Sequence, residues 1–141
     1  MFSFSNKSEK ILVVDDMSLS RVSIKRVLVE LGFNSVELAE NGLTAWEKLA
    51  TSRQANAPFG LVLSDWMMPE LDGLGLFKKL AGSGWSDIPP FILITAESDS
   101  FQVGEAIKLG ISGYIRKPIT LEALEKTLKE LNGSPQTGKT P

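Results

Sequence analysis

The 141-residue sequence contains no cysteine and no histidine. Without cysteine, disulfides and thiolate metal sites are excluded. Without histidine, the commonest general base, imidazole metal ligands and a phosphohistidine carrier role are excluded as well. A metal ion bound by this chain would therefore have oxygen ligands.

Long apolar runs, a basic charge balance and a secretory signal are also missing. No apolar stretch approaches the roughly 20 residues that span a membrane. The net charge of −2 provides no general field for nucleic acid, whose binding domains usually carry a basic stripe. Residues 1–8 lack the basic start and apolar core of a signal peptide. We therefore expect a cytoplasmic protein with no membrane and no nucleic-acid partner.

The composition fits one folded domain. Hydrophobic residues make up 43% and charged residues 23% of the chain, which is ordinary for a globular domain with its own core. Residues 132–141 are Gly, Ser, Pro, Thr, Gln, Lys and Asn with no apolar anchor, so we expect a disordered tail there. The predicted organisation is an N-terminal tail over 1–9, one domain over 10–131 and a C-terminal tail over 132–141.

Short apolar runs alternate five times with segments of helical periodicity. The runs predict buried parallel strands over 10–14, 35–39, 59–64, 91–94 and 113–116. The periodic segments predict helices over about 18–31, 42–50, 74–82, 99–109 and 119–131, and polar stretches predict loops at 51–58 and 83–90. In the fourth helix we expect Val103, Ala106 and Ile107 to face the core. Five such units predict a doubly wound, flavodoxin-like α/β domain with one five-stranded parallel sheet.

Five polar residues stand at the carboxyl ends of the predicted strands: Asp15, Asp16, Asp65, Thr95 and Lys117. The carboxyl ends of parallel strands lie along one edge of a sheet, so residues distant in sequence converge there. The predicted cluster contains three carboxylates, a hydroxyl and an ammonium group. This combination suits a divalent cation, above all Mg²⁺, together with a phosphoryl group.

Each member of the cluster also has a simpler interpretation. Aspartate is a preferred helix N-cap, and so is threonine, so Asp15, Asp16 and Thr95 could cap the helices that follow them. Lysine is usually a solvated surface residue, which is the alternative for Lys117. A carboxylate beside a metal can, however, act as a nucleophile towards phosphorus. That possibility distinguishes Asp65, which lies between an apolar strand and a Trp-Met-Met-Pro run.

Several stretches together resemble the receiver domains of bacterial two-component response regulators, most closely the single-domain chemotaxis regulators of the CheY type. Each stretch is a weak signal alone, but their order and spacing over about residues 10–131 are specific. The matching stretches are Leu12–Asp16, Glu30–Asn34, Ser64–Trp66, Met68–Pro69, Leu71–Leu74, Thr95–Glu97, Gly110, Ser112–Tyr114 and Lys117–Pro118.

The resemblance implies a role for each site residue. Asp65 is the expected phosphoacceptor, and Mg²⁺, or Mn²⁺ in its place, is expected at a metal site. The implied metal ligands are Asp15, Asp16, Asp65 and the backbone carbonyl of Met67; the phosphate-binding residues are Thr95, Ala96 and Lys117; the switch residues are Thr95 and Tyr114; and Pro118 follows a cis peptide bond.

The resemblance also implies partners. A sensor histidine kinase would donate the phosphoryl group to Asp65. The face formed by the helix over 99–109, the strand over 113–116 and the final helix would then bind an output protein, such as a flagellar motor switch protein. Such a protein is a signalling switch and not an enzyme acting on a separate substrate.

Three departures bear on this assignment. The loop over 51–58 is about five residues longer than in the chemotaxis proteins. Met67 replaces a polar residue, and Ser98-Asp99-Ser100 replaces a lysine-bearing helix start that contributes to motor binding. A phosphorelay intermediate or a kinase-regulating receiver therefore remains an alternative to a motor regulator.

Other classes fit the residues less well. A small-molecule aspartyl-phosphate phosphatase would usually carry a second acid where Met67 stands. A flavin carrier would need a phosphate loop where Asp15 and Asp16 stand, and a receiver without phosphorylation would not need the full cluster. Residues 133–140 match the nucleotide P-loop pattern, but that motif requires a preceding strand and a following helix. We assign this segment to the tail.

Overall fold

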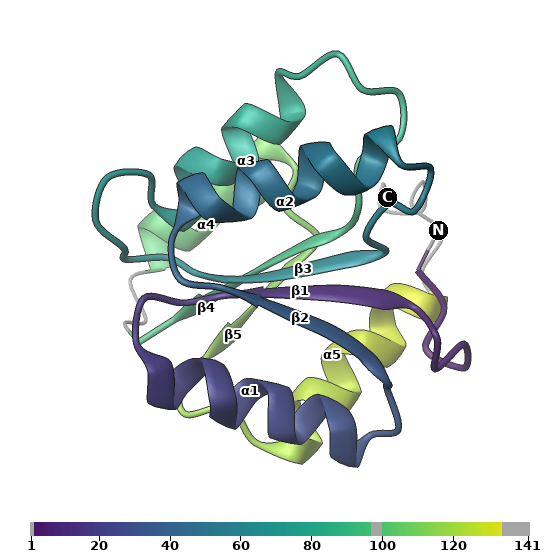
Figure 1. Cartoon of the computed structure of the whole chain (residues 1–141). Coiled ribbons are helices and arrows are strands. Elements are labelled where there is room, and N and C mark those ends of the chain that lie inside the picture. The colour runs from purple at the N-terminus through teal and green to yellow at the C-terminus, as the bar shows by residue number, and fades with distance from the viewer. Residues whose placement is uncertain (1, 97–99, 134–141) are drawn as a thin grey trace.

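The computed structural model describes residues 2–96 and 100–133, and it contains one parallel sheet with strand order β2–β1–β3–β4–β5. The strands are β1 (Lys10–Val14), β2 (Ser35–Ala39), β3 (Leu61–Asp65), β4 (Phe91–Thr95) and β5 (Gly113–Arg116). The helices are α1 (Ser18–Glu30), α2 (Gly42–Gln54), α3 (Gly73–Ala81), α4 (Ser100–Leu109) and α5 (Leu121–Gly133). Helices α1 and α5 cover one face of the sheet and α2, α3 and α4 cover the other (Figure 1). The predicted doubly wound, flavodoxin-like fold is confirmed.

The strands are apolar throughout because both faces of the sheet are covered. In β1, Ile11 and Val13 join the core under α1 and α5, whereas Leu12 and Val14 join the core under α2, α3 and α4. All four side chains are fully buried. Successive side chains of a strand point to opposite faces, so a strand between two helical layers needs apolar residues at every position.

Helix α2 is longer than the sequence pattern predicts. The predicted loop over 51–58 is wrong for its first half, because α2 continues through Gln54. The polar residues of this stretch gave no apolar period from which the extra helical turn could be predicted. In the structure Ser52 is buried, and its hydroxyl donates to the carbonyl of Leu49 at 3.1 Å. Similarly, Asn132 and Gly133, assigned to the tail, belong to α5. Residues 134–141, including nearly all of the rejected P-loop match, lie outside the described residues.

One predicted core residue of α4 faces outward. Val103 and Ala106 are buried as expected, but Ile107 is 50% exposed. In β3 and β4 the candidate site residues Asp65 and Thr95 are the last residues of the strands themselves. Their backbones are therefore fixed by the sheet.

Residues 2–9 pack against the domain, although the sequence pattern placed them outside it. Phe2 is 2% exposed and belongs to the core under α1 and α5. Phe4 packs edge-on against Phe33, with ring centroids 5.6 Å apart. The ammonium of Lys7 lies over both rings, 3.5 Å from the Phe4 centroid. This N-terminal segment therefore adds to the core.

The order in which successive strands are added to the parallel sheet reverses between β1 and β3. Strand β1 pairs with β2 on one side and with β3 on the other, so the crossovers through α1 and α2 run to opposite sides of β1. A crevice forms at the carboxyl ends of the strands at such a point. In the described ranges no helix is long and apolar enough to cross a membrane.

Candidate functional site

Two neighbouring strands bring the aspartates together. Asp15 follows β1 directly, and Asp65 is the last residue of β3. The amide of Asp15 donates to the carbonyl of Ala39, and the amide of Trp66 donates to the carbonyl of Ile94. The backbone on both sides of the crevice is thus held by adjacent strands.

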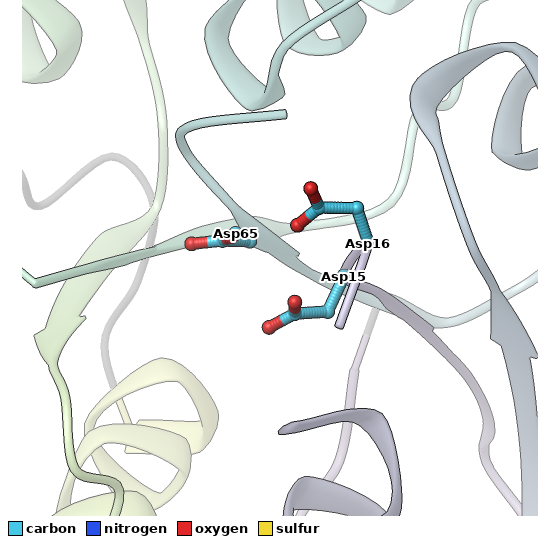
Figure 2. A group of neighbouring side chains, drawn as sticks. All are labelled: Asp15, Asp16 and Asp65. Atoms are coloured by element: carbon cyan, nitrogen blue, oxygen red, sulfur yellow. The ribbon is translucent and has the colours of Figure 1, made fainter. Parts of the chain in front are cut away.

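Figure 2 shows the side chains of Asp15, Asp16 and Asp65 gathered around one space. One carboxylate oxygen from each residue lies within 4.8 Å of the others. Asp15 is fully buried and Asp65 is 7% exposed, whereas Asp16 is exposed. The three carboxylates of the predicted cluster therefore lie together, and they differ in their access to water.

Asp15 is held on two sides. Its Oδ1 accepts a hydrogen bond from the amide of Met17 at 2.9 Å. The guanidinium of Arg21 donates to the main-chain carbonyl of Asp15 at 2.7 Å. The Asp15 Oδ2 atom is buried and, apart from its ion pair with Lys117, has no hydrogen-bond donor within the described part of the chain. Buried oxygens without donors are costly, so this atom is suited to a cation.

Lys117 enters the crevice from the end of β5. Its ammonium lies 3.3 Å from Asp15 Oδ2 and 3.4 Å from Asp65 Oδ1. The amide of Lys117 donates to the carbonyl of Thr95 at 2.8 Å, which continues the pairing of β5 with β4. The peptide bond to Pro118 is cis. Lys117 thus reaches the carboxylates from the end of β5, the outermost strand next to β4.

The charges shift two pKa values. Burial raises the pKa of the Asp65 carboxyl, the Asp15 carboxylate raises it further, and the Lys117 ammonium opposes the shift. Burial lowers the pKa of the Lys117 ammonium, but the carboxylates of Asp65 and Asp15 together outweigh it and raise this pKa. One ammonium therefore does not fully compensate the clustered carboxylates.

The residues present fit a divalent cation with hard oxygen ligands. Three carboxylates share one space, one of them has an oxygen without a donor, and one side of the cluster is exposed to water. Mg²⁺ typically binds through one or two carboxylates and retains several waters. Asp15, Asp16 and Asp65 can supply the carboxylates and still leave room for water or phosphate oxygens.

The other predicted residues occupy the same edge or the strands leading to it. Thr95 is 6% exposed, whereas the Met67 side chain is 75% exposed. Ala96 is exposed in the turn after β4. Tyr114 lies on β5 opposite Leu93 and is 42% exposed. Glu97 and the substituted positions Ser98 and Asp99 lie outside the described residues.

Sequence patterns missed the contacts that fix Asp15 and assigned no role to Gly73, which lies in one of the matching stretches. Arg21 and the amide of Met17 fix Asp15, and no motif signals them because one acts on a main-chain carbonyl and the other is itself main chain. Gly73 supports the loop after β3: a Cβ there would overlap the carbonyl oxygen of Asp65. Its amide donates to the carbonyl of Trp66 at 2.8 Å. A glycine is therefore required where α3 begins.

Comparison with known proteins agrees with this geometry. Residues 11–129 match the family model of the response regulator receiver domain. The chain is 42% identical to the chemotaxis protein CheY1 of Helicobacter pylori over 125 residues, covering 89% of this chain and 98% of that protein. It is 38% identical to CheY-3 of Vibrio cholerae over 126 residues, covering 89% and 93%.

Solved structures share the architecture. CheY4 of Vibrio cholerae superposes with a TM-score of 0.76 at 28% identity, covering 87% of this chain and 98% of that one. A CheX–CheY–BeF₃–Mg complex from Borrelia burgdorferi gives a TM-score of 0.78 at 20% identity, covering 87% and 88%, and shows the shared fold. Receiver domains are signalling switches that bind Mg²⁺ at an acidic site, and the cluster of Asp15, Asp16 and Asp65 corresponds to such a site. The chain belongs to the response regulator receiver domain family, and its relatives include CheY chemotaxis proteins.

Proposed function

We propose that this protein is a cytoplasmic response regulator that is phosphorylated on Asp65 by a sensor histidine kinase. The observation that carries the proposal is the position of Asp65. Its carboxylate ends a buried strand, lies within 4.8 Å of two further carboxylates and is 3.4 Å from the Lys117 ammonium. A nucleophile, a cation-binding cluster and a fixed positive charge thus meet in one crevice.

In the proposed reaction, a carboxylate oxygen of Asp65 attacks the phosphorus of a phosphohistidine. The phosphorus–nitrogen bond breaks, the imidazole leaves with the bonding electron pair and takes up a proton, and an acyl phosphate forms on Asp65. Hydrolysis later returns the carboxylate and inorganic phosphate. A bound Mg²⁺ or Mn²⁺ ion supplies charge compensation when two anions approach. Asp15, Asp16, Asp65 and the Met67 carbonyl would hold that ion.

The remaining site residues bind the phosphoryl group. Lys117 is already directed at Asp65 and can pair with a phosphoryl oxygen as a point charge. Thr95, at the end of the adjacent strand, supplies a hydroxyl, and Ala96 supplies a backbone amide. In this scheme the hydroxyl of Thr95 moves towards the phosphoryl oxygen and Tyr114 changes rotamer, because packed interiors favour discrete arrangements.

The output surface in this proposal is the face of α4, β5 and α5. Tyr114 is exposed on β5, so a rotamer change there alters the surface directly. The named relatives are chemotaxis proteins, which favours a motor switch protein or another signalling protein as the partner. The two conformations differ in free energy by only a few kcal/mol, so a partner that binds one of them more tightly responds to the shift between them.

Phosphorylation by a small-molecule donor tests the site without requiring the cognate kinase. The parent protein, incubated with phosphoramidate and Mg²⁺, is expected to gain one phosphoryl group, measured by intact mass. Asp65→Asn and chelation by EDTA should each abolish the gain. Glu70→Gln, which removes an exposed carboxylate five residues away, is the matched control and should be labelled like the parent. Labelling of Asp65→Asn at the parental rate would show that another residue accepts the phosphoryl group.

A further inference from the structure

A groove lies beside the amino ends of β4 and β5, on the open edge of the sheet. It has a volume of about 710 Å³, and its apolar wall includes Phe2, Ile107, Tyr114 and Leu131. Ile107 and Tyr114 are 50% and 42% exposed, so they present apolar surface to solvent. The volume lies within the range of ligand-binding pockets. We call this feature the β5-edge groove; none of the three clustered aspartates lines it.

One wall of the β5-edge groove is held in place by aromatic and cationic contacts. Trp85, in the loop before β4, stacks on Trp46 of α2 with centroids 5.0 Å apart and planes 9° from parallel. The guanidinium of Arg53 lies 4.8 Å from the Trp85 centroid and donates to the carbonyl of Asp87 at 3.2 Å. The backbone at Asp87 is therefore fixed before a partner arrives, which lowers the entropic cost of binding.

The base of the groove is also ordered. The amide of Phe91 donates to the hydroxyl of Ser112 at 3.0 Å, and the amide of Ser112 donates to the carbonyl of Phe91 at 2.8 Å. Phe2 contributes a nearly fully buried ring from the N-terminal segment. An apolar side chain entering this space would meet preformed walls.

The charge of the groove has one sign. Among the described residues, the only charged side chains that line it are Asp87 and Glu130, and both are exposed. Neither takes part in an ion pair within the described part of the chain. Lys129, next to Glu130, instead pairs with Glu125 at 3.0 Å, and Arg53 contacts the carbonyl of Asp87 rather than its carboxylate.

From the apolar walls and these two carboxylates, we infer that the β5-edge groove binds a protein segment that inserts an apolar side chain between flanking lysine or arginine residues. The apolar side chain fills the space beside Ile107 and Leu131, and the flanking cations pair with Asp87 and Glu130. Charge complementarity of this kind selects partners and orients them. An acidic segment is disfavoured, because it would place like charges at the rim.

This inference rests on the proposed function in one respect, because Tyr114 both lines the groove and is the proposed switch residue. If phosphorylation of Asp65 moves the Tyr114 ring, the groove changes shape where Tyr114 lines it. The groove then has different affinities in the two states, and by linkage a bound segment changes the stability of the phosphorylated state.

Two labelled peptides test the charge preference. They share a Leu-Ile-Phe core, flanked by lysines in one and by glutamates in the other, and binding is followed by fluorescence anisotropy. The lysine-flanked peptide should bind at least about tenfold more tightly, with an affinity that falls as salt is added. Asp87→Asn combined with Glu130→Gln should weaken it by roughly threefold to tenfold, since exposed ion pairs contribute modestly. Glu70→Gln combined with Glu47→Gln, which removes the same charge away from the groove, should leave binding unchanged.

The outcomes separate this inference from the proposed function. Beryllofluoride loading is monitored by tryptophan fluorescence, to which Trp66, next to Asp65, contributes, and loading should change the peptide affinity by about fivefold or more. Failure to load contradicts the proposed function. Successful loading with equal affinity for both peptides, or with no loss in the groove variant, overturns the inference. Sedimentation of the protein alone, if it gives a dimer that Ile107→Ser disrupts, would assign the groove to a second copy and overturn it too.

Discussion

Replacing Lys117 with methionine tests whether its ammonium group and a divalent cation compensate the same carboxylate charges. The Lys117→Met variant keeps most of the apolar stem but removes the charge that lies 3.3 Å from Asp15 and 3.4 Å from Asp65. In EDTA this leaves a fully buried carboxylate without its counter-ion, so the variant should be less stable than the parent. A divalent cation can take over the compensation, so added Mg²⁺ should restore much of the loss.

The magnitude follows from the distances and the exposure. Each contact is worth about 5 kcal/mol of gross Coulomb energy at an effective dielectric constant near 20. Most of this is offset by desolvation, and breaking a buried pair costs roughly 3–5 kcal/mol. The Lys117 side chain is 24% exposed, which reduces the expected loss in EDTA to about 2–3 kcal/mol. With the competing ammonium gone, the affinity for Mg²⁺ should rise about tenfold, which returns about 1.4 kcal/mol at saturation.

Urea unfolding in EDTA and in saturating Mg²⁺, followed by tryptophan fluorescence, measures the free energy of unfolding under both conditions. A Mg²⁺ titration of the folded protein gives the dissociation constant. Lys108→Met is the control, because its ion pair with Glu105 is exposed and should contribute less than about 0.5 kcal/mol. An equal loss of stability in EDTA and in Mg²⁺, with an unchanged dissociation constant, would refute the assignment of Lys117 and the metal to a shared charge balance.

Three further variants probe the same site. Asp65→Asn should be more stable than the parent at neutral pH in EDTA, because the raised pKa of Asp65 means that the fold disfavours its charged form; the difference in free energy of unfolding should shrink as the pH falls through that raised pKa and vanish only below the ordinary pKa of the unfolded chain, where the carboxyl is protonated in both states. Thr95→Ala should still accept phosphate, measured by intact mass, yet lose most of the phosphorylation-dependent change in partner affinity; an affinity gain equal to the parent's would contradict the switch. Met67→Asn should shorten the lifetime of the acyl phosphate, measured by phosphate release, because a polar side chain can orient a hydrolytic water and a thioether is only a weak acceptor; unchanged or slower decay would exclude this role.

The sheet and the acidic cluster could be predicted from sequence because a single rule governs both. Fully buried strands such as β1 read as continuous apolar runs, and a polar residue that ends such a run marks the edge of the sheet. Local pattern and tertiary environment agree there. The positions of Asp15, Asp65 and Lys117 at strand ends predict that they share one crevice, and the Lys117 ammonium lies within 3.4 Å of both carboxylates.

The errors occur where tertiary contacts override the local pattern. Helix α2 extends past its predicted end, where Ser52 is buried in the domain and Arg53 contacts the Trp85 ring and the carbonyl of Asp87, although this stretch reads as a loop. Ile107 has the helical spacing of a core residue, but it is half exposed and lines the groove. Phe2 is buried, although the residues around it show no periodic apolar pattern. The difference between buried Asp15 and exposed Asp16 is likewise invisible in the sequence, because both residues follow the same strand.

The burial of Phe2 determines how this protein can be labelled. Any chain fused ahead of Phe2 would emerge beside α5 and the β5-edge groove, where it could displace the ring or compete for the groove. A tag or fluorophore at the amino end would therefore alter the stability of α5 and the binding of partners. A label attached at an exposed residue of α2, such as Glu47, would leave both the groove and the acidic cluster unobstructed.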